Sequence, residues 1–417
     1  MDKPEVEPSM NEDADLDAIG DVGGEDAGET APPGDPFFVS KSAAAVLKHG
    51  ILSRYLPPFV SKVGSTSSGH RVALLDGYAG PGRYKDGTAG SPALLAETAR
   101  TVSAYRTVEC HLVEQKRTSY KLLQSFLSGE GADLSATAYP GRVQTHLNTV
   151  LAASSGIPLF SYLDPFGFGV PFADVVRLLR RHPEPNGPAT EVLLNFTANG
   201  IRRAGGFLKP GREITPSEEK TLQLGDAACG GDWWRVIVKS QTVLEKAVEG
   251  VAQEYMRRVC KASNMNGFAL DVKNREHHKP VYYLIFFTRH LDGMWLFNES
   301  VSLASAKWRE VLAPPPWEPD EDLLFDMPTA PSFAEEESTR ATHWVAEIEA
   351  NIERLIQAGD FVVGAKMTEV YGRTLGEARE MHVRRALTAL RDAGKIESDA
   401  KGEIRTKRVI RQITNPT

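Results

Sequence analysis

The stretch VALLDGYAGPG, at residues 72–82, decides the fold of this chain. A short apolar run leads to Asp76 and then to three glycines, Gly77, Gly80 and Gly82. This pattern is typical of a buried parallel strand that ends in a glycine turn, where a nucleoside cofactor can approach the backbone. Glycine suits such a turn because a Cβ atom would collide with the ligand or forbid a positive φ.

Two further acidic residues follow predicted strands. Glu114 ends the apolar stretch that begins near residue 107, and Asp164 follows the apolar run 159–163. Ligands of open parallel sheets bind outside the carboxyl ends of the strands, near the switch in strand order. We therefore expect Asp76, Glu114 and Asp164 at one edge of the sheet.

These positions suit S-adenosylmethionine (SAM). Asp76 could orient its aminoacyl end, directly or through water, and Glu114 could accept both ribose hydroxyls. Gly80 and Gly82 would leave room for the cofactor. A dinucleotide is the poorer alternative, because Glu114 lies 38 residues after Asp76, whereas a dinucleotide fingerprint places its acidic residue roughly 20 residues on. A structural turn with surface carboxylates is the remaining alternative.

The segment Asp164-Pro165-Phe166-Gly167 is the candidate substrate site. In amino-methyltransferases, an acidic or amide residue followed by proline and an aromatic residue accepts hydrogen bonds from an amine and stacks on the base. The second proline that is usual there is replaced by Phe166, and Phe168 is a rival stacking residue. The segment could instead form a wall of the cofactor pocket or a plain turn.

The chain from residue 70 to residue 200 alternates between strand-like and helix-like stretches, which predicts βαβ units and a mostly parallel sheet covered on both faces. Strands are expected at 72–75, 107–113, 142–146, 159–163 and 191–196, with a late edge or antiparallel strand at 281–288. Residues 206–265 are expected to be mostly helical. The fold class is thus α/β and Rossmann-like.

The C-terminal part has a different composition. Residues 312–338 are rich in proline and acidic residues, which predicts an extended linker between a core at 36–311 and a small domain at 339–417. Helices are expected at 342–358, 367–371 and 376–393, with Gly394 as a helix stop and a hairpin over 395–410. This order is the outline of a winged helix.

The bulk numbers describe an ordinary globular protein with an unusual N-terminal segment. The 417 residues are enough for two domains. The net charge of −7 combines −11 in residues 1–35 with +4 in the rest, so a disordered acidic tail is expected before a mildly basic body.

Location and metal content can also be judged from the sequence. No apolar run approaches the ~20 residues that cross a bilayer, and the acidic N-terminus does not fit a secretory signal. A cytoplasmic protein without membrane association is expected. Cys110, Cys229 and Cys260 lack the spacing of a metal site, so no metal and no disulfide are predicted, and Cys110 is expected in the core.

Other polar residues carry weaker signals. Asn195 and Asn199 follow a predicted strand and could contact substrate or merely cap the loop. The pair His277-His278 is best explained as a solvated loop. Basic residues on the last predicted helix, at 384, 385, 391 and 395, could contact phosphates, although a solvated helix face is the simpler explanation.

Taken together, these motifs resemble the three-Cys-motif partner (TcmP) proteins. The resemblance rests on Leu75–Tyr84 with Gly90-Ser91-Pro92, on Leu163–Gly167, and on Asn195-Phe196 with Ile201-Arg202, and it covers roughly residues 37–310. It implies a class I methyltransferase-like core with an appended winged helix. The three cysteines of the family name belong to a partner protein that resembles radical-SAM enzymes, not to this chain.

The resemblance and the motifs suggest two functions. In the first, a SAM-dependent methyltransferase modifies a nitrogen of a nucleic-acid base, with Asp164, Pro165 and Phe166 positioning the amine. In the second, the core is a non-catalytic adaptor for the three-Cys-motif protein, and the winged helix binds DNA or RNA.

Overall fold

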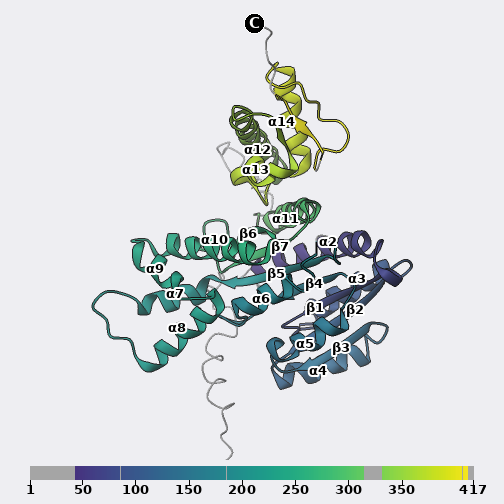
Figure 1. The fold of residues 1–417 in the computed structure, drawn as a ribbon, viewed down its shortest axis with the longest axis vertical. Coiled ribbons are helices and arrows are strands. Elements are labelled where there is room, and N and C mark those ends of the chain that lie inside the picture. The colour runs from purple at the N-terminus through teal and green to yellow at the C-terminus, as the bar shows by residue number, and fades with distance from the viewer. Residues whose placement is uncertain (1–42, 85, 185, 314–330, 406, 412–417) are drawn as a thin grey trace, which may run out of the picture.

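The computed structural model describes residues 43–84, 86–184, 186–313, 331–405 and 407–411. A seven-stranded sheet forms its centre (Figure 1). The strands are β1 Arg71–Asp76, β2 Thr107–Glu114, β3 Ser135–Pro140, β4 Leu159–Leu163, β5 Thr190–Thr197, β6 Asn266–Val272 and β7 Tyr282–Thr288.

The strand order is β3-β2-β1-β4-β5-β7-β6. Strands β1 to β5 are parallel, and β7 lies antiparallel between β5 and β6. The order reverses between β1 and β4, which makes the carboxyl ends of these two strands the topological switch point. The predicted Rossmann-like, class I methyltransferase-like fold is confirmed.

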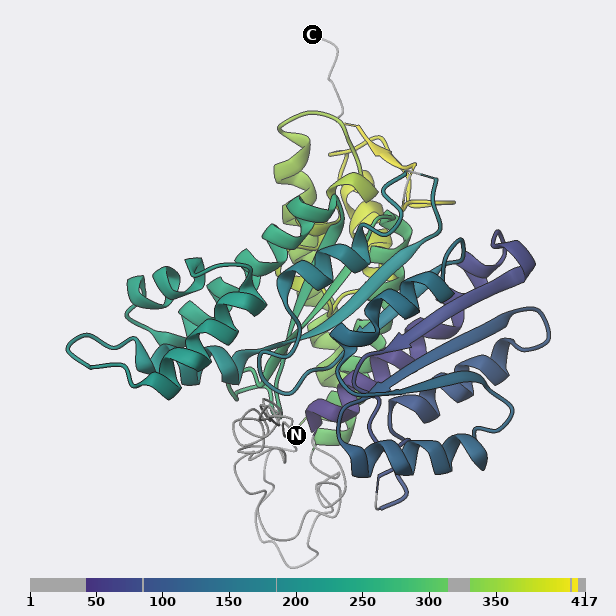
Figure 2. The ribbon, with the colours of Figure 1, turned by 60° about the horizontal axis from the view of Figure 1, so that its bottom comes forward.

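Helices cover both faces of the sheet because successive strand residues point to opposite sides. One face packs on α2 Ala43–Gly64, α3 Ser91–Val102, α4 Arg117–Ser128 and α11 Leu291–Leu312. The other packs on α5 Val143–Ala153, α6 Phe172–Leu179, α7 Ala198–Phe207 and α10 Leu244–Ser263, and on these helices lie α8 Pro216–Cys229 and α9 Trp233–Ser240. Helices α7 to α9 extend to one side of the molecule, away from β1 to β3 (Figure 2).

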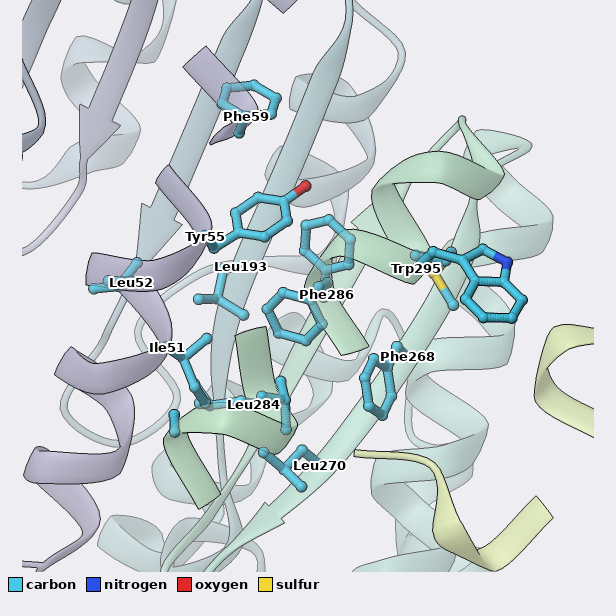
Figure 3. Close-up of a cluster of buried hydrophobic side chains, with 14 of the residues drawn as sticks. Ile51, Leu52, Tyr55, Phe59, Leu193, Phe268, Leu270, Leu284, Phe286 and Trp295 are labelled. Carbon is cyan, nitrogen blue, oxygen red and sulfur yellow. The ribbon is translucent and has the colours of Figure 1, made fainter. Parts of the chain in front are cut away.

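An aromatic cluster joins α2 to the sheet and to α11 (Figure 3). Tyr55 of α2 lies 5.2 Å from Phe286 of β7, and Phe286 stacks on Phe297 of α11 with ring centroids 4.2 Å apart. Aromatic pairs in such geometries stabilise a fold by about 0.5–1.5 kcal/mol beyond their burial. The cluster fixes α2, and with it the position of Lys48, against the sheet.

The C-terminal unit consists of α12 Phe333–Ile356, β8 Phe361–Val362, α13 Met367–Tyr371, α14 Glu380–Asp392 and β9 Val409–Ile410. It packs on α11 (Figure 1) and shares one hydrophobic cluster with the core. Asn298 of α11 accepts a hydrogen bond from the Gly376 amide and donates one to the Ala378 carbonyl. The winged helix itself stays a prediction.

Three predictions of secondary structure were wrong or incomplete. Residues 142–146 are not a strand, because Val143, Leu147 and Val150 recur at helical spacing and are buried in α5. The third strand is β3, which precedes the positive-φ residue Gly141. Edge strand β6 was missed, although its buried residues Phe268, Leu270 and Val272 alternate at a period of two.

The expected hairpin over 395–410 is formed in part. The Glu397 amide donates a hydrogen bond of 3.2 Å to the Arg411 carbonyl, and the Ser398 hydroxyl donates one of 2.8 Å to the Val409 carbonyl. Strand β9 also pairs with the short apolar strand β8, which was not predicted. Gly394 follows α14 with a φ of +70°, as predicted for a helix stop. The acidic tail and most of the proline-rich linker lie outside the described residues. Residues 333–338, which were predicted to belong to the linker, form the first turns of α12, because Ser332 and Glu335 make a capping box there.

Candidate functional site

The switch point brings the three predicted acidic residues to the same edge of the sheet. Asp76 ends β1, Glu114 ends β2, and Asp164 directly follows β4. The charges of Asp164 and Glu114 both help to raise the pKa of Asp76, so the three carboxylates are near one another.

Asp76 is completely buried. Its Oδ1 accepts a hydrogen bond of 3.1 Å from the Tyr78 amide, whereas its Oδ2 has no partner among the described residues. Burial raises the pKa of Asp76 to about 7, although the nearby Ser91 hydroxyl and the Tyr78 amide oppose the rise. A buried carboxylate oxygen without a donor is costly, and it is a natural place for a ligand cation or N–H group.

Glu114 holds the glycine turn. Its Oε2 accepts a hydrogen bond of 2.8 Å from the Gly80 amide, and its Oε1 accepts one of 2.6 Å from the Lys116 amide. A carboxylate offers about four acceptor positions, so each oxygen can accept a second hydrogen bond. Two neighbouring hydroxyl groups could therefore still bind there.

The two glycines predicted to admit a cofactor have different surroundings. Gly80 has a φ of +66°, and a Cβ built on it would meet no atom within 4 Å. Gly82 has a φ of +86°, and its Cβ would lie 2.6 Å from the Phe126 ring. Gly80 therefore faces open space, whereas Gly82 is packed against the core. The role of Gly82 toward a cofactor stays a prediction.

Asp164 is the centre of a hydrogen-bond network. Its Oδ2 accepts hydrogen bonds from Lys48 Nζ at 2.5 Å and from the Tyr162 hydroxyl at 2.9 Å, and its Oδ1 accepts one from Asn195 Nδ2 at 2.5 Å. Burial alone would raise the pKa of Asp164, but Lys48, Asn195 and Tyr162 together hold that pKa below its ordinary value. Asp164 is therefore ionised at neutral pH.

Lys48 is the site residue that the motifs missed. It lies on α2, and its side chain is only 14% exposed. Burial acts to lower the pKa of Lys48, but Asp164 holds it above the ordinary value. A signal was present in the sequence, since Lys48 is in register with Ala44, Ile51 and Tyr55, which are the apolar face of the predicted helix.

The residues after Asp164 split between core and solvent. Pro165 is buried, and Gly169 fits beside it because a Cβ there would lie 2.3 Å from the proline and 2.7 Å from the Tyr78 hydroxyl. Phe166 is 82% exposed. Phe168 packs on Trp234 instead, with ring centroids 6.1 Å apart. Phe166 is thus the aromatic ring with a free face at this position.

The loop after the glycine turn lies beside the same carboxylates. Tyr84 is 47% exposed, and burial together with the charges of Asp164 and Asp76 raises its pKa, while Lys48 opposes the rise. The Tyr84 amide donates a hydrogen bond of 3.0 Å to the Thr88 carbonyl. The loop is therefore a compact turn at the mouth of the site.

The weaker candidates have mostly structural surroundings. Asn195 contacts Asp164 as described, whereas the Asn199 side chain accepts a hydrogen bond of 2.6 Å from Arg202. The rings of His277 and His278 lie 4.6 Å apart in a loop. No group of three or more potential metal ligands occurs within the part of the chain that the structure describes. Cys110 is buried in the core, as predicted.

Acidic neighbours neutralise most of the basic residues around α14. Arg384 and Arg405 both pair with Glu380, Arg391 pairs with Asp392, and Lys395 pairs with Glu353. Arg385 is exposed and makes no ion pair within the described ranges. This face therefore offers little uncompensated positive charge to a phosphate backbone.

No family model matches the chain, and no curated protein matches it. Solved structures with a similar chain path include an O-methyltransferase from Bacillus cereus in complex with SAH, which is 12% identical with a TM-score of 0.32 and covers 60% of this chain and 93% of its own. The O-methyltransferase TomG from Streptomyces achromogenes, in complex with SAM, is 11% identical with a TM-score of 0.29 and covers 60% and 79%. Likeness at this level says nothing of activity, and SAM and SAH are ligands of those two proteins.

None of the described helices has the length and apolar character of a membrane span.

Proposed function

We propose that this protein is a SAM-dependent methyltransferase. The observation that carries the proposal is the unpartnered Oδ2 of buried Asp76 at the switch point, next to the open space above Gly80. Natural structures rarely leave a buried carboxylate oxygen without a donor, and such sites are enriched in ligand-binding positions.

The residues present fit the methyl donor. Asp76 would bind the aminoacyl ammonium, Glu114 would accept the ribose hydroxyls through its remaining acceptor positions, and Gly80 would allow the close approach. When bound, SAM supplies a methyl group that is already activated by its sulfonium. The protein therefore has mainly to bind and align the acceptor.

We further propose a nitrogen of a nucleic-acid base as the acceptor. Three hydrogen bonds leave about one acceptor position on Asp164 Oδ1, which suits one N–H of an amine. The exposed ring of Phe166 could stack on a base, which must leave a duplex to reach the site. The resemblance to TcmP proteins is compatible with this assignment.

A second candidate is the adaptor that binds a radical-SAM-like three-Cys-motif protein. It is favoured by the occupation of Asp164 by Lys48, Tyr162 and Asn195, because most of the carboxylate is already used within the chain. An adaptor would keep its partner after Asp76→Ala and Asp164→Ala. A pull-down with the partner protein would measure this.

The deciding experiment is transfer of a labelled methyl group from SAM to DNA and RNA by the full chain. Phe166→Ala should lower transfer, whereas Leu122→Ala, at a residue 56% exposed on α4, should not. Asp164→Asn should abolish transfer and leave the affinity for SAM nearly unchanged. An equal loss of both would place Asp164 in the cofactor site, and SAM binding without transfer to either nucleic acid would favour the adaptor.

A further inference from the structure

Two neighbouring hollows lie at the opposite edge of the sheet, where β4 and β5 begin. The larger, of about 500 Å³, lies between the ends of α5 and α6, and its walls include Arg177, Arg180, Arg181 and His182. The smaller, of about 170 Å³, lies beside the end of α10 and is lined by Arg180, Arg289 and Asn264 among others. Arg180 lines both hollows, and we name the two hollows together the arginine groove.

Arg181 carries a charge that no described carboxylate neutralises. Its guanidinium donates to the Thr190 hydroxyl at 2.8 Å, to the Ser154 carbonyl at 2.8 Å and to the Ile157 carbonyl. All three acceptors are neutral, and burial lowers the pKa of Arg181 to about 10. The hydrogen bonds hold the guanidinium in place while its positive charge remains uncompensated.

The other cations of the groove are similar. Arg289 donates to the backbone carbonyls of His182 and Glu184. Arg180 is exposed, and its side chain forms no hydrogen bond or ion pair with any residue that the structure describes. Burial lowers the pKa of His182, and the charges of Arg181 and Arg289 lower it further, against the opposing charge of Glu184. The charges of Arg181 and Arg289 therefore both act at His182, and an anion bound beside His182 would be attracted by both guanidinium groups.

Few carboxylates offset this charge. Arg177 lies 3.8 Å from Asp174, one turn earlier on the same helix, and Glu184 is exposed at the rim. The contrast with α14 is that Arg384, Arg391, Lys395 and Arg405 there each have a carboxylate partner. Arg180 and Arg181 of the arginine groove have none among the described residues.

We infer that the arginine groove binds the phosphodiester backbone of a nucleic acid. Guanidinium groups bind phosphate oxygens through paired hydrogen bonds, and cations spread along an open groove suit a chain of phosphates better than a single ion. Strand β4, of five residues, separates this edge from Asp164 by roughly 17 Å. The inference does not rest on the proposed function, since it holds for an enzyme and for an adaptor.

The test is the binding of a fluorescein-labelled single-stranded DNA oligonucleotide to the full chain, measured by anisotropy at several salt concentrations. Arg180→Glu should weaken binding at least about tenfold, and the slope of log affinity against log salt should fall by about one. Arg180 supports no other described group, so the melting temperature should not change. The matched control is Arg385→Glu on α14, which changes the charge equally and should leave the affinity unchanged.

Two results would overturn the inference. One is unchanged affinity in Arg180→Glu, or an equal loss in Arg385→Glu, which would move the contact to α14. The other is displacement of the oligonucleotide by inorganic phosphate at millimolar concentration, together with phosphate binding that Arg180→Glu abolishes. That second result would retain the phosphate chemistry and assign the groove to a free phosphate ion.

Discussion

Lys48 Nζ lies 2.5 Å from Asp164 Oδ2, which joins the first described helix to the carboxyl end of β4. Both side chains are largely buried, with exposed fractions of 14% and 22%. Replacing only one residue of a buried ion pair destabilises a protein more than replacing both, because the remaining charge is then buried without a partner.

We therefore expect Lys48→Met to destabilise the protein at neutral pH by roughly 3–5 kcal/mol. The double variant Lys48→Met with Asp164→Asn should recover much of that loss, since neither charge remains. Urea unfolding of the two single variants and the double variant measures the coupling. Purely additive losses would contradict a close ion pair.

Asp76→Asn should stabilise the protein without ligand at alkaline pH. The pKa of Asp76 is about 7 in the folded state and 3.8 ordinarily, so the folded protein binds the extra proton more tightly. The stabilisation that Asp76 contributes is fully present below about pH 4 and is lost as the pH rises through 7. Asparagine has no charge to bury at any pH, so the variant avoids this loss. At pH 8 its free energy of unfolding should exceed that of the native protein by roughly 1–3 kcal/mol, after subtraction of the cost of its unpaired amide.

The check is the free energy of unfolding of both proteins at pH 4 and pH 8. At pH 4 the folded carboxyl group is neutral, so Asp76→Asn should give no stabilisation there and only the cost of its unpaired amide should remain. A stabilisation that is equal at both pH values would argue against a buried ionised Asp76.

Gly80→Ala and Gly82→Ala should separate ligand binding from folding. At Gly80 the new methyl group meets no atom, so the stability cost is that of a positive φ, about 1 kcal/mol, while the affinity for SAM should fall. At Gly82 the methyl group would collide with Phe126, and the stability loss should be larger. Thermal melts and SAM titrations of both variants test this, and unchanged affinity in Gly80→Ala would exclude a close approach there.

Asn298→Ala should loosen the C-terminal unit. The substitution leaves the Gly376 amide and the Ala378 carbonyl without partners in a buried contact, at a cost of about 2–3 kcal/mol. Because the unit shares a hydrophobic cluster with the core, the native protein should unfold in one calorimetric transition. The variant should show a lower or separate transition for residues 331–411. Two well-separated transitions in the native protein would contradict the shared core.

The sequence predicted the edge of the sheet on which Asp76, Glu114 and Asp164 lie, because strand ends and glycine turns are local signals. It did not predict that Lys48 approaches Asp164, since that contact joins residues 116 positions apart and depends on how α2 packs. Likewise, Gly80 and Gly82 look equivalent in sequence, and only the position of Phe126 distinguishes them.

The arginine groove was also beyond sequence reasoning. Arg289 is far along the chain from Arg180 and Arg181, and the antiparallel pairing of β7 with β5 brings it to them. The basic residues around α14 show both cases. Arg384 pairs with Glu380 four residues earlier on the same helix, which the sequence spacing can indicate, whereas Lys395 pairs with Glu353 of α12, which it cannot.

The most direct test of the proposed methyltransferase is calorimetric titration of SAM and SAH into the full chain, beside Asp76→Asn. We expect micromolar binding of both ligands to the native protein and a loss of at least about tenfold for SAM in the variant, as is common for a buried charged hydrogen bond. Absence of binding to the correctly folded native protein would contradict the proposed cofactor site, and equal affinity in Asp76→Asn would contradict the role of Asp76.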